Sequence, residues 1–469
     1  MRGSRGRARA EGSLAAAGAT TARALGWGAV AAHAAGLGFR IGVALLGRGA
    51  PGAPAPAVPA PSPAPVFTVL GPLRDEAGRV GPWLDAVAAL RYPRERLDVV
   101  LLLEPDDPAT RRAAEREAAR LGHPRWLRLL VVPPGGPRTK PRALNHGLAA
   151  AAGELLVVYD AEDLPDPDQL LAAAAGFAGH PAEVACLQAR PVVAAPAGDR
   201  FGRLMAAEYR LWHGGFLPGL ARLGAPLPLA GTSNHLRVEP LRRLGGWDPR
   251  NVTEDAELGL RLARAGLRTE VLASRTVEDA TPPGVSAWLR QRSRWSKGYM
   301  QTWLGAVGRP GRLAAQLGAG RAACVHLTLA GTAAVQLATP LLWAAGAVWA
   351  ARAAAGRRRR PTALELAGAA SAVGGTLARL AALRALRGDA EGVGRAGLAA
   401  PLYWALEGVA AWRGLHGLIV APERWDKTAH PPAPGPDVPA RPGPSGRPAR
   451  AAARGPRRSR PGWANIRGS

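Results

Sequence analysis

Short apolar runs alternate with amphipathic segments between residues 66 and about 190, and this alternation restricts the fold more than any other feature of the chain. Strand–helix alternation of this kind predicts an α/β fold built on a doubly wound sheet. Ligands of such sheets bind at the carboxyl ends of the strands, so the residues that follow each run are candidates for a functional site. The expected buried strands are 66–71, 98–103, 127–132 and 154–159, with helices near 79–91, 109–121 and 140–152.

The strongly basic composition does not by itself identify a partner. The 469 residues include 61 basic and 35 acidic residues, and a net charge of +26 usually indicates nucleic acid or an anionic membrane surface. Only Lys140, Lys297 and Lys427 are lysines, so arginine replaces lysine across the chain and much of the charge is compositional background. We recognise no nucleic-acid-binding module and expect no nucleic acid partner. No G-x-G-x-x-G follows the first expected strand, which argues against a dinucleotide-binding oxidoreductase.

Changes in composition divide the chain into six regions. We expect a basic disordered N-terminus (1–13), one or more membrane segments (14–48), a stiff Pro/Ala linker (49–65), a catalytic domain (66–310), C-terminal membrane helices (311–428) and a disordered basic tail (429–469). Within the second region, a membrane helix near 25–47 has just enough residues to cross a bilayer. Whether 14–47 crosses once, forms a short hairpin or does not cross stays open at this point.

Three apolar runs, 322–353, 362–386 and 396–420, follow the expected catalytic domain. The first is longer than the ~20 residues that a simple span needs. The stretch "ATPLLW" near its middle could therefore break it into a hairpin. A hairpin would also place the basic cluster 357–360 on the cytoplasmic side, as the positive-inside rule requires.

An acidic cluster follows the fourth expected strand. Asp160, Glu162 and Asp163 come directly after the run 154–159, where mutual repulsion would be costly unless a cation were present. Hard oxygen ligands beside a phosphate suit Mg²⁺ or Mn²⁺. The alternative is an acidic loop that caps the next helix.

Two further polar segments follow expected strands. Glu104, Asp106 and Asp107 come after the second strand, where an acid could accept a hydrogen bond from the base or ribose of a nucleotide, or could simply begin a helix. Lys140 lies at a helix start, a favourable place for a diphosphate. Lys140 could also be ordinary surface charge, but the scarcity of lysine favours a function.

The segment "NVTEDAELGL" places Thr253, Glu254 and Asp255 just before an amphipathic helix. A threonine N-cap followed by acids in the first turn is an ordinary helix start. The functional alternative makes Asp255 a general base that takes the proton from an attacking hydroxyl.

In "QRSRWSKGYMQTW", Gln291, Arg294 and Trp295 are spaced i, i+3 and i+4, so they share one face of a helix expected over 286–303. An arginine can stabilise charge on a diphosphate leaving group, and a tryptophan can stack on a sugar ring. Alone, this helix would fit a membrane surface better. Together with three acidic clusters, it indicates the wall of an active site.

These motifs carry a resemblance. D-x-(D/E) at Asp160–Glu162, T-E-D at 253–255 and Q-x-x-R-W at Gln291–Trp295 occur in the order and approximate spacing of the family 2 glycosyltransferases. More narrowly, "PRTKPRALNHGL", "PLAGTSNHLR" and "WDKTAH" resemble the cellulose-synthase-like, membrane-bound bacterial branch. The resemblance covers roughly 66–430. It implies a GT-A fold with a mixed sheet flanked by membrane helices, a nucleotide diphosphate sugar donor and an inverting single displacement.

The resemblance also implies a role for each matching residue. Asp255 is the implied base, and Asp160 and Glu162 are the implied ligands of Mg²⁺ or Mn²⁺. The implied donor-binding residues are Lys140, Asp160, Arg294 and either Glu104 or Asp106. The implied acceptor-site residues are Gly231, Thr232, Ser233, Asn234, His235, Glu254, Gln291 and Trp295. The third position of D-x-D is here a glutamate, which keeps the charge on a longer side chain.

The expected function is elongation of a cell-surface polysaccharide from a UDP-sugar, with UDP-glucose as the first choice. The partners are then the donor, a glycan acceptor and the lipid bilayer, with accessory or export subunits left open. The expected location is the cytoplasmic membrane, multi-pass, with the catalytic domain in the cytoplasm. One alternative adds a single sugar to a lipid or short acceptor. Another is a non-catalytic membrane scaffold, which the intact Asp160, Asp255 and Arg294 argue against.

Overall fold

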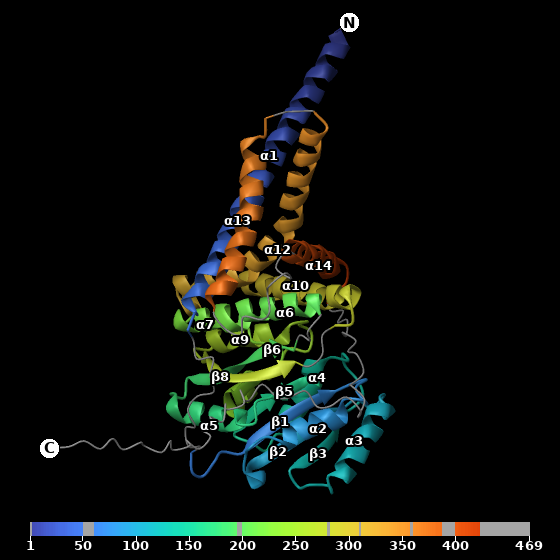
Figure 1. Cartoon of the computed structure of the whole chain (residues 1–469), viewed down its shortest axis with the longest axis vertical. Coiled ribbons are helices and arrows are strands. Elements are labelled where there is room, and N and C mark those ends of the chain that lie inside the picture. Colours follow the sequence, from blue (N-terminus) through green and yellow to red (C-terminus); the bar gives the residue numbers. More distant parts are fainter. Residues whose placement is uncertain are drawn as a thin grey trace, which may run out of the picture. The chain divides into compact units, whose positions relative to one another are not determined.

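An eight-stranded mixed sheet with the strand order β3-β2-β1-β4-β7-β6-β8-β5 forms the centre of the catalytic region (Figure 1). The computed structural model describes residues 2–49, 61–194, 199–278, 282–308, 311–356, 360–386 and 399–422, without the side chains of residues 1–19. The predicted tail (429–469) and residues 50–60 of the predicted linker lie outside the described residues. The strands are β1 (Phe67–Leu73), β2 (Leu97–Leu103), β3 (Leu127–Val131), β4 (Leu155–Val158), β5 (Asp163–Pro165), β6 (Val184–Val193), β7 (Asn234–Arg237) and β8 (Arg268–Glu278).

The four strands predicted from the apolar runs form one parallel half of this sheet. β1 pairs with β2 and with β4, and β2 pairs with β3, all in parallel. Every residue of β2 and β4 is buried, as expected for strands covered on both faces. The predicted helices are also present, as α2 (Val80–Ala88), α3 (Pro108–Arg120) and α4 (Lys140–Ala150). The doubly wound α/β half of the fold is therefore confirmed.

Two hydrophobic cores hold helices against the two faces of the sheet. On one face, Phe67 and Leu101 pack with Trp83 of α2 and with Phe177 of α5 (Gln169–Gly179). On the other face, Leu70 packs with residues of α4, of α8 (Val238–Arg243) and of α9 (Glu254–Arg264). α4 and α9 thus lie on the same face, and their first residues meet at the carboxyl edge of the sheet.

The other half of the sheet was missed by the sequence analysis. β7 is antiparallel to β4 and β6, β6 is parallel to β8, and β5 is antiparallel to β8. β6 and β8 mix polar residues such as Gln188 and Arg275 into their apolar pattern, and their pairing contains two register shifts. Their stability comes from their neighbours in the sheet, so their own sequences carry a weak strand signal.

A layer of helices lies over the edge of the sheet where the predicted site residues meet. It contains α6 (Arg200–Leu211), the π-helical turn η2 (Trp212–Phe216), α7 (Leu217–Arg222), α10 (Val285–Val307), α11 (Arg312–Leu317) and α14 (Ala400–Val420). α10 confirms the helix predicted over 286–303. α14 packs closely along α10, since a Cβ at Gly414 would lie 2.6 Å from the carbonyl oxygen of Ser293. α10 is therefore held between the sheet and α14.

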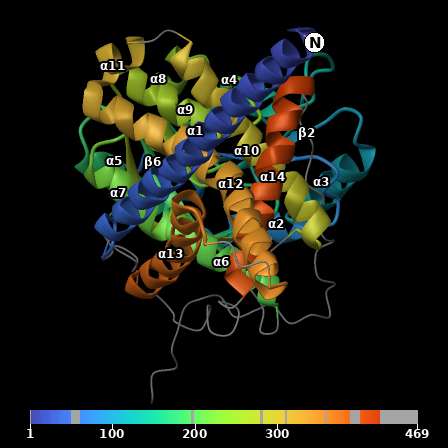
Figure 2. The same ribbon diagram turned by 90° about the horizontal axis from the view of Figure 1, so that it is seen from above.

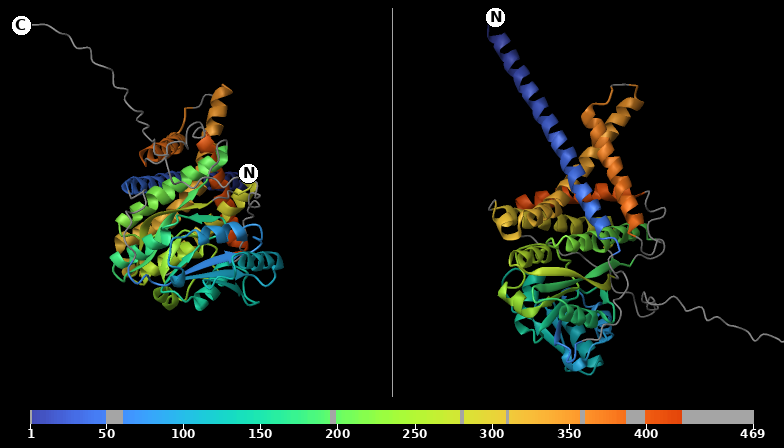
Figure 3. Two further views of the ribbon diagram at one scale, coloured as in Figure 1. Left: turned by 60° about the horizontal axis from the view of Figure 1, so that its bottom comes forward. Right: turned by 90° about the vertical axis from the view of Figure 1, so that its left-hand side faces the viewer.

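In the described parts of the chain, three helices are long and apolar enough to cross a membrane. They are α1 (Arg2–Leu46, from Thr20 onward), α12 (Ala319–Ala354) and α13 (Ala363–Ala385). They rise together from the helical layer on the side away from the sheet (Figure 1), and α1 crosses the other two at an angle (Figures 2 and 3). Gly36 of α1 meets Gly331 of α12 at the crossing, where a Cβ on Gly36 would lie 2.8 Å from the Gly331 carbonyl oxygen. Small residues of this kind allow membrane helices to approach closely.

Three predictions about this region differ from the structure. The run 322–353 is part of one continuous helix, α12, which keeps Pro340 inside it, so the predicted hairpin is wrong. α12 packs on α10 and α14 in the helical layer as well as on the other candidate spans, which accounts for a length beyond that of a simple span. Residues 400–420 of the third run form α14, which is not among the three candidate spans. Residues 2–13, predicted to be disordered, continue α1.

Candidate functional site

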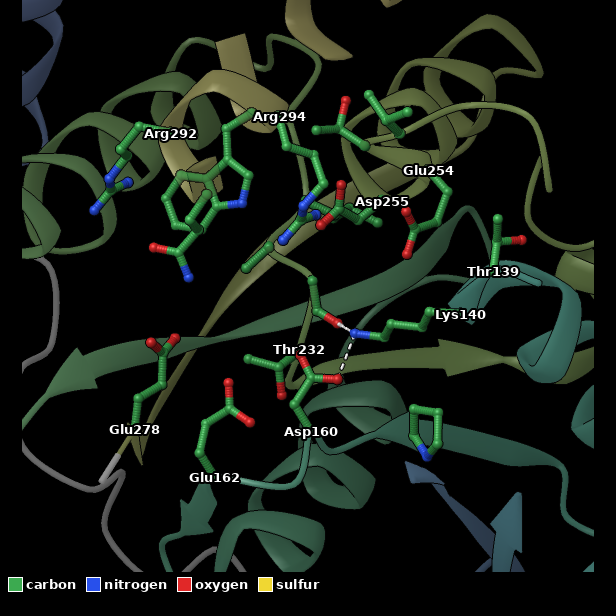
Figure 4. Close-up of a pocket in the computed structure, with 18 of the residues that line it drawn as sticks. Thr139, Lys140, Asp160, Glu162, Thr232, Glu254, Asp255, Glu278, Arg292 and Arg294 are labelled. Carbon is green, nitrogen blue, oxygen red and sulfur yellow. Dashed lines mark hydrogen bonds and ion pairs between the residues drawn. The ribbon is translucent and has the colours of Figure 1, made fainter. Parts of the chain in front are cut away.

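A cavity of about 280 Å³ lies at the carboxyl ends of β1, β2 and β4, beneath α10. Figure 4 shows the side chains that converge on it from α4, α9, α10 and the loops after β4 and before β7. Eleven of the predicted site residues line this cavity, namely Glu104, Lys140, Asp160, Glu162, Gly231, Thr232, Glu254, Asp255, Gln291, Arg294 and Trp295. Residues spread over nearly 200 positions of the chain are thus brought to one place.

Lys140, the first residue of α4, lies at the centre of the cavity. Its Nζ is 2.5 Å from Asp160 Oδ1 and donates a hydrogen bond to the Gly231 carbonyl oxygen at 2.6 Å (Figure 4). Burial alone lowers the Lys140 pKa, but Asp160, Glu254 and Asp255 outweigh it and raise the pKa above its ordinary value. Lys140 therefore stays charged and is a fixed positive group for an anionic ligand.

Asp255 and Glu254 begin α9 and face the cavity from the other side of Lys140. Asp255 Oδ1 accepts a hydrogen bond from the Ala256 N–H at 2.7 Å. Burial raises the pKa of Asp255, while that hydrogen bond and the charges of Lys140 and Arg294 limit the rise. Burial, with the neighbouring Asp255, raises the pKa of Glu254 to about 7. A buried carboxylate whose pKa is raised towards neutral pH has the properties of a general base.

The position of α9 depends on close packing against α10. Gly298 of α10 leaves no room for a Cβ, which would clash with the side chain of Thr253 at the start of α9. Thr253 occupies the predicted N-cap position but makes no capping hydrogen bond through its side chain. The glycine in the "RWSKGY" segment therefore brings the helix that carries Arg294 against the segment that carries Asp255.

The carboxylates of the acidic loop after β4 lie in two different environments. Asp160 and Glu162 line the cavity. Asp163 is 1 % exposed, and it accepts hydrogen bonds from the Asp160 backbone N–H at 2.6 Å and from the Thr232 hydroxyl. Asp163 therefore shapes the loop that presents Asp160 and Glu162.

Glu278, at the end of β8, is a cavity residue that the sequence analysis missed. It lies beside Glu162 (Figure 4) and accepts a hydrogen bond from the Tyr209 hydroxyl at 3.0 Å. Burial, followed by the nearby Glu162, raises the pKa of Glu278 to about 8. The register of β5 with β8, which pairs Asp163 with Glu278, brings the two glutamates together. No local motif marks Glu278 in the sequence, because the strand that it ends, β8, was not recognised there.

Carboxylates that face one another favour a divalent cation. Among the described residues, no group of three His, Cys, Asp or Glu side chains is close enough to form a complete metal site. Mg²⁺, however, is commonly held by one or two carboxylates together with substrate phosphates and water. Asp160 and Glu162 fit this arrangement, because the repulsion between Glu162 and Glu278 would be relieved by a cation beside them.

The two acids predicted as alternatives for nucleotide binding occupy different environments. Glu104 lines the cavity, is 6 % exposed and lies 3.4 Å from the Arg142 guanidinium. Asp106 is not among the lining residues, and it pairs with Arg138 at 2.5 Å. Position therefore favours Glu104 over Asp106 as the acid that meets a ligand.

Three residues predicted to border an acceptor site are placed elsewhere. Ser233, Asn234 and His235 are at most 1 % exposed and do not line the cavity. The His235 ring packs edge-on against Phe67 and Tyr159 in the core. Because these residues enter β7, only Gly231 and Thr232 just before the strand remain at the cavity, and the prediction is wrong for the other three.

The side of the cavity nearest the candidate membrane helices contains residues that the sequence analysis did not single out. Arg40 of α1, Thr332 and Gln336 of α12 and Trp212 of η2 line it together with Arg292. Arg292 stacks on Trp295, with its guanidinium carbon 4.0 Å from the ring centroid, and pairs with Glu208 at 2.8 Å. The cavity thus extends from the edge of the sheet to the base of α1 and α12.

Comparison with known proteins agrees with this geometry. Residues 155–364 match the sequence model of the family described as "Glycosyl transferase family group 2". This region of the chain is therefore similar to the family 2 glycosyltransferases. The matched region contains the T-E-D and Q-x-x-R-W segments, and it extends through α12 to the start of α13.

Two curated relatives and one solved structure illustrate how the glycosyltransferase domain relates to known proteins. "Probable glycosyltransferase YdaM" of Bacillus subtilis (strain 168) is 24% identical over 235 residues, which is 50% of this chain and 55% of that protein. "Beta-monoglucosyldiacylglycerol synthase" of Synechocystis sp. (strain ATCC 27184 / PCC 6803 / Kazusa) is 27% identical over 241 residues, 51% of this chain and 49% of that protein. The chain therefore spans about half the length of these relatives.

The solved structure is the mannosyltransferase PcManGT from Pyrobaculum calidifontis, in complex with GDP-Man and Mn²⁺. It aligns with a TM-score of 0.54 and 23% identity, and the alignment covers 84% of this chain and 98% of that one. At this identity the likeness establishes the fold. The fold is GT-A, as the motifs implied.

Proposed function

We propose that this chain is an inverting glycosyltransferase, which transfers a sugar from a nucleotide diphosphate sugar to a hydroxyl of an acceptor at the cytoplasmic membrane. The observation that carries the proposal is the shared cavity. It places two cations, Lys140 and Arg294, beside the carboxylates of Asp160 and Asp255. A diphosphate and an activated hydroxyl can meet only where both kinds of group are present.

The donor occupies the end of the cavity next to the sheet. Lys140 and Arg294 bind the diphosphate and stabilise the charge that develops as it leaves. Glu104 accepts a hydrogen bond from the base or ribose. A divalent cation, Mg²⁺ or Mn²⁺, held by Asp160 and Glu162 would neutralise further diphosphate charge. UDP-glucose is the first donor to test, with GDP-mannose included because the structural neighbour was solved with it.

Asp255 acts as the base. Its carboxylate takes the proton of the acceptor hydroxyl, whose oxygen attacks the anomeric carbon on the side opposite the diphosphate. The bond from the anomeric carbon to the diphosphate oxygen breaks as the new glycosidic bond forms, so the anomeric configuration inverts. The charges of Lys140 and Arg294 favour the ionised form of Asp255 and oppose the rise in its pKa that burial causes, which supports this role.

The acceptor reaches the cavity from the side of the membrane helices. Arg40, Thr332 and Gln336 line that end and belong to α1 and α12, two of the candidate spans. An acceptor anchored in the bilayer would reach the cavity along this wall, so transfer of one sugar to a lipid is the acceptor chemistry that we favour. The Synechocystis relative, named for a glucosyldiacylglycerol product, supports the same choice. Elongation of a polysaccharide is the second candidate, supported by the Q-x-x-R-W motif.

A cytosolic donor requires the catalytic domain to lie in the cytoplasm. With α1, α12 and α13 each crossing once, the start of α1 and the connection between α12 and α13 would lie on the opposite side, although the positive-inside rule favours the cytoplasm for both of these basic segments. This topology leaves α14 at the cytoplasmic surface, where it covers α10. We propose it in preference to an N-terminal hairpin.

The test is sugar transfer by purified protein in lipid nanodiscs, with labelled UDP- and GDP-sugars in the presence of Mg²⁺, Mn²⁺ or EDTA. We expect one donor to give a product that partitions into organic solvent and that disappears with EDTA. Asp255→Asn should abolish the product while donor binding persists, whereas Glu239→Gln, on the exposed face of α8, should behave as wild type.

Each alternative has its own result. A long water-soluble polymer would establish elongation in place of lipid glycosylation. Bound nucleotide without transfer from any donor would identify a non-catalytic scaffold. A near-normal rate with Asp255→Asn would show that another group is the base.

A further inference from the structure

Arg40 is an arginine inside a candidate membrane helix that lines the cavity. It lies within the span Thr20–Leu46, and its guanidinium carbon is 5.3 Å from the centroid of the Trp212 ring. In the described parts of the chain, no carboxylate lies within ion-pair distance of it. A cation in a membrane segment is costly unless it has a partner, and such residues commonly mark a functional site.

The charge around Arg40 is positive on balance. Arg292 of α10 is paired with Glu208 of α6, and Arg379 of α13 is buried over the ring of Trp404. The other acid in this region, Glu407 of α14, is 6 % exposed, and burial together with Glu208 raises its pKa to about 7. Three arginines are therefore opposed by only two carboxyl groups, those of Glu208 and Glu407. An anionic ligand could supply the negative charge that is missing here.

An unpartnered hydroxyl at the same end of the cavity gives a second, independent indication. Thr332 of α12 is 6 % exposed, lines the cavity, and its Oγ1 makes no hydrogen bond within the described structure. Burying a hydroxyl without a partner costs about 1–3 kcal/mol. The neighbouring Gln336 already accepts a hydrogen bond from the Ser296 hydroxyl at 3.0 Å. Thr332 is therefore available to a polar group that enters between α1 and α12.

Aromatic rings connect Arg40 with the base. The Tyr299 ring centroid is 6.1 Å from that of Trp212, on which Arg40 stacks. Burial and the charge of Asp255 raise the Tyr299 pKa, while Arg40 lowers it, so both charged groups act on this phenol. The cavity therefore runs from Asp255 past Tyr299 and Trp212 to Arg40. A molecule that spans it meets a carboxylate at one end and a guanidinium at the other.

We propose that the acceptor is a membrane lipid with an anionic group, a phosphate, set back from the hydroxyl that receives the sugar. Arg40 binds the phosphate, Thr332 assists it, and the rings of Tyr299 and Trp212 support the atoms between the phosphate and the hydroxyl. This inference rests on the proposed function and specifies its acceptor. Arg40 is a binding residue for the remote part of the acceptor, so it should affect acceptor affinity and not donor affinity.

Two lipids separate the effect of the phosphate from that of the hydroxyl. Phosphatidylglycerol carries hydroxyls beside a phosphodiester, whereas diacylglycerol carries a hydroxyl and no phosphate. With the full chain in phosphatidylcholine nanodiscs, Arg40→Gln should raise the KM for phosphatidylglycerol roughly tenfold or more, as for loss of a hydrogen bond to a charged group. The donor KM and the slow hydrolysis of donor without acceptor should not change. Arg40→Lys should recover much of the loss.

Arg23→Gln provides the matched control, since Arg23 is an exposed arginine on the same helix and does not line the cavity. Binding is measured separately by native mass spectrometry, as retention of phosphatidylglycerol over phosphatidylcholine. We expect wild type, Arg40→Lys and Arg23→Gln to retain phosphatidylglycerol and Arg40→Gln to lose it. This readout does not depend on catalysis.

The outcomes distinguish this inference from the proposed function. Retention that depends on Arg40, without sugar transfer from any donor, would refute the transferase and leave the anionic lipid site in place. Equal transfer to both lipids, or an Arg40→Gln variant with unchanged phosphatidylglycerol retention, would overturn the inference. Stimulation by phosphatidylglycerol without its glycosylation would also overturn it, because the lipid would then be an effector and not the acceptor.

Discussion

Adding one methyl group at Gly231 tests the geometry of the site most directly. A Cβ there would lie 3.1 Å from Asp255 Oδ2, 3.6 Å from Lys140 Nζ and 3.9 Å from Asp160 Oδ2. Gly231 is not among the residues with positive φ, so alanine is compatible with the backbone. Gly231→Ala therefore perturbs the functional groups and leaves the backbone conformation unchanged.

The size of the effect follows from these distances. Non-bonded atoms are ordinarily about 3.5–4 Å apart, so the Asp255 carboxylate must move by a few tenths of an ångström. A displacement of about 1 Å can cost 10²-fold in rate, and we expect a smaller loss of about tenfold in kcat/KM, or about 1.4 kcal/mol. Alanine lowers the conformational entropy of the unfolded chain, which stabilises the protein. This gain offsets the cost of tighter packing in the folded state, so the melting temperature should change little.

The assay is the initial rate of sugar transfer in nanodiscs, together with the melting temperature of each variant. Gly179→Ala is the matched control, because a Cβ at Gly179 would meet nothing within 4 Å. A Gly231→Ala rate within twofold of wild type would refute the assignment of Asp255 and Lys140 to the reacting centre. A rate loss that a lower melting temperature fully explained would refute the assignment equally.

Three further predictions follow from particular side chains. Glu104→Gln should raise the donor KM about tenfold, whereas Asp106→Asn should not, because Glu104 lines the cavity and Asp106 does not. With EDTA present, Glu278 should by itself lower the free energy of unfolding by up to about 1.4 kcal/mol per pH unit as the pH rises from about 5 to 8, because folded Glu278, with a pKa of about 8, holds a proton that the unfolded chain has lost. Glu278→Gln should reduce the pH dependence by this amount, and an unchanged slope would contradict the raised pKa. Trp295→Ala should raise the acceptor KM, and shorten any polymer, while the donor KM stays constant, which steady-state kinetics with each substrate varied would check.

The parallel half of the sheet could be predicted because its signal is local. Strands such as 98–103 are buried on both faces, and the apolar run that burial requires is visible in the sequence. β6, β7 and β8 are stabilised by pairing with strands distant in the chain, and their own residues alternate too irregularly to indicate a strand. The same dependence on distant partners placed Asn234 and His235 in β7, buried Ser233 just before it, and kept all three away from the cavity.

The sequence by itself determined the chemistry that is available. Asp160, Lys140, Asp255 and Arg294 each lie at the end of an element or on one helix face, where their spacing reveals them. Only the tertiary structure decided which other groups join them. Glu278 reaches the site through the pairing of β5 with β8, and Arg40 reaches it because α1 crosses α12 nearly 300 residues further along the chain. Contacts of this kind depend on packing between elements distant in sequence, and no local pattern of residues records them.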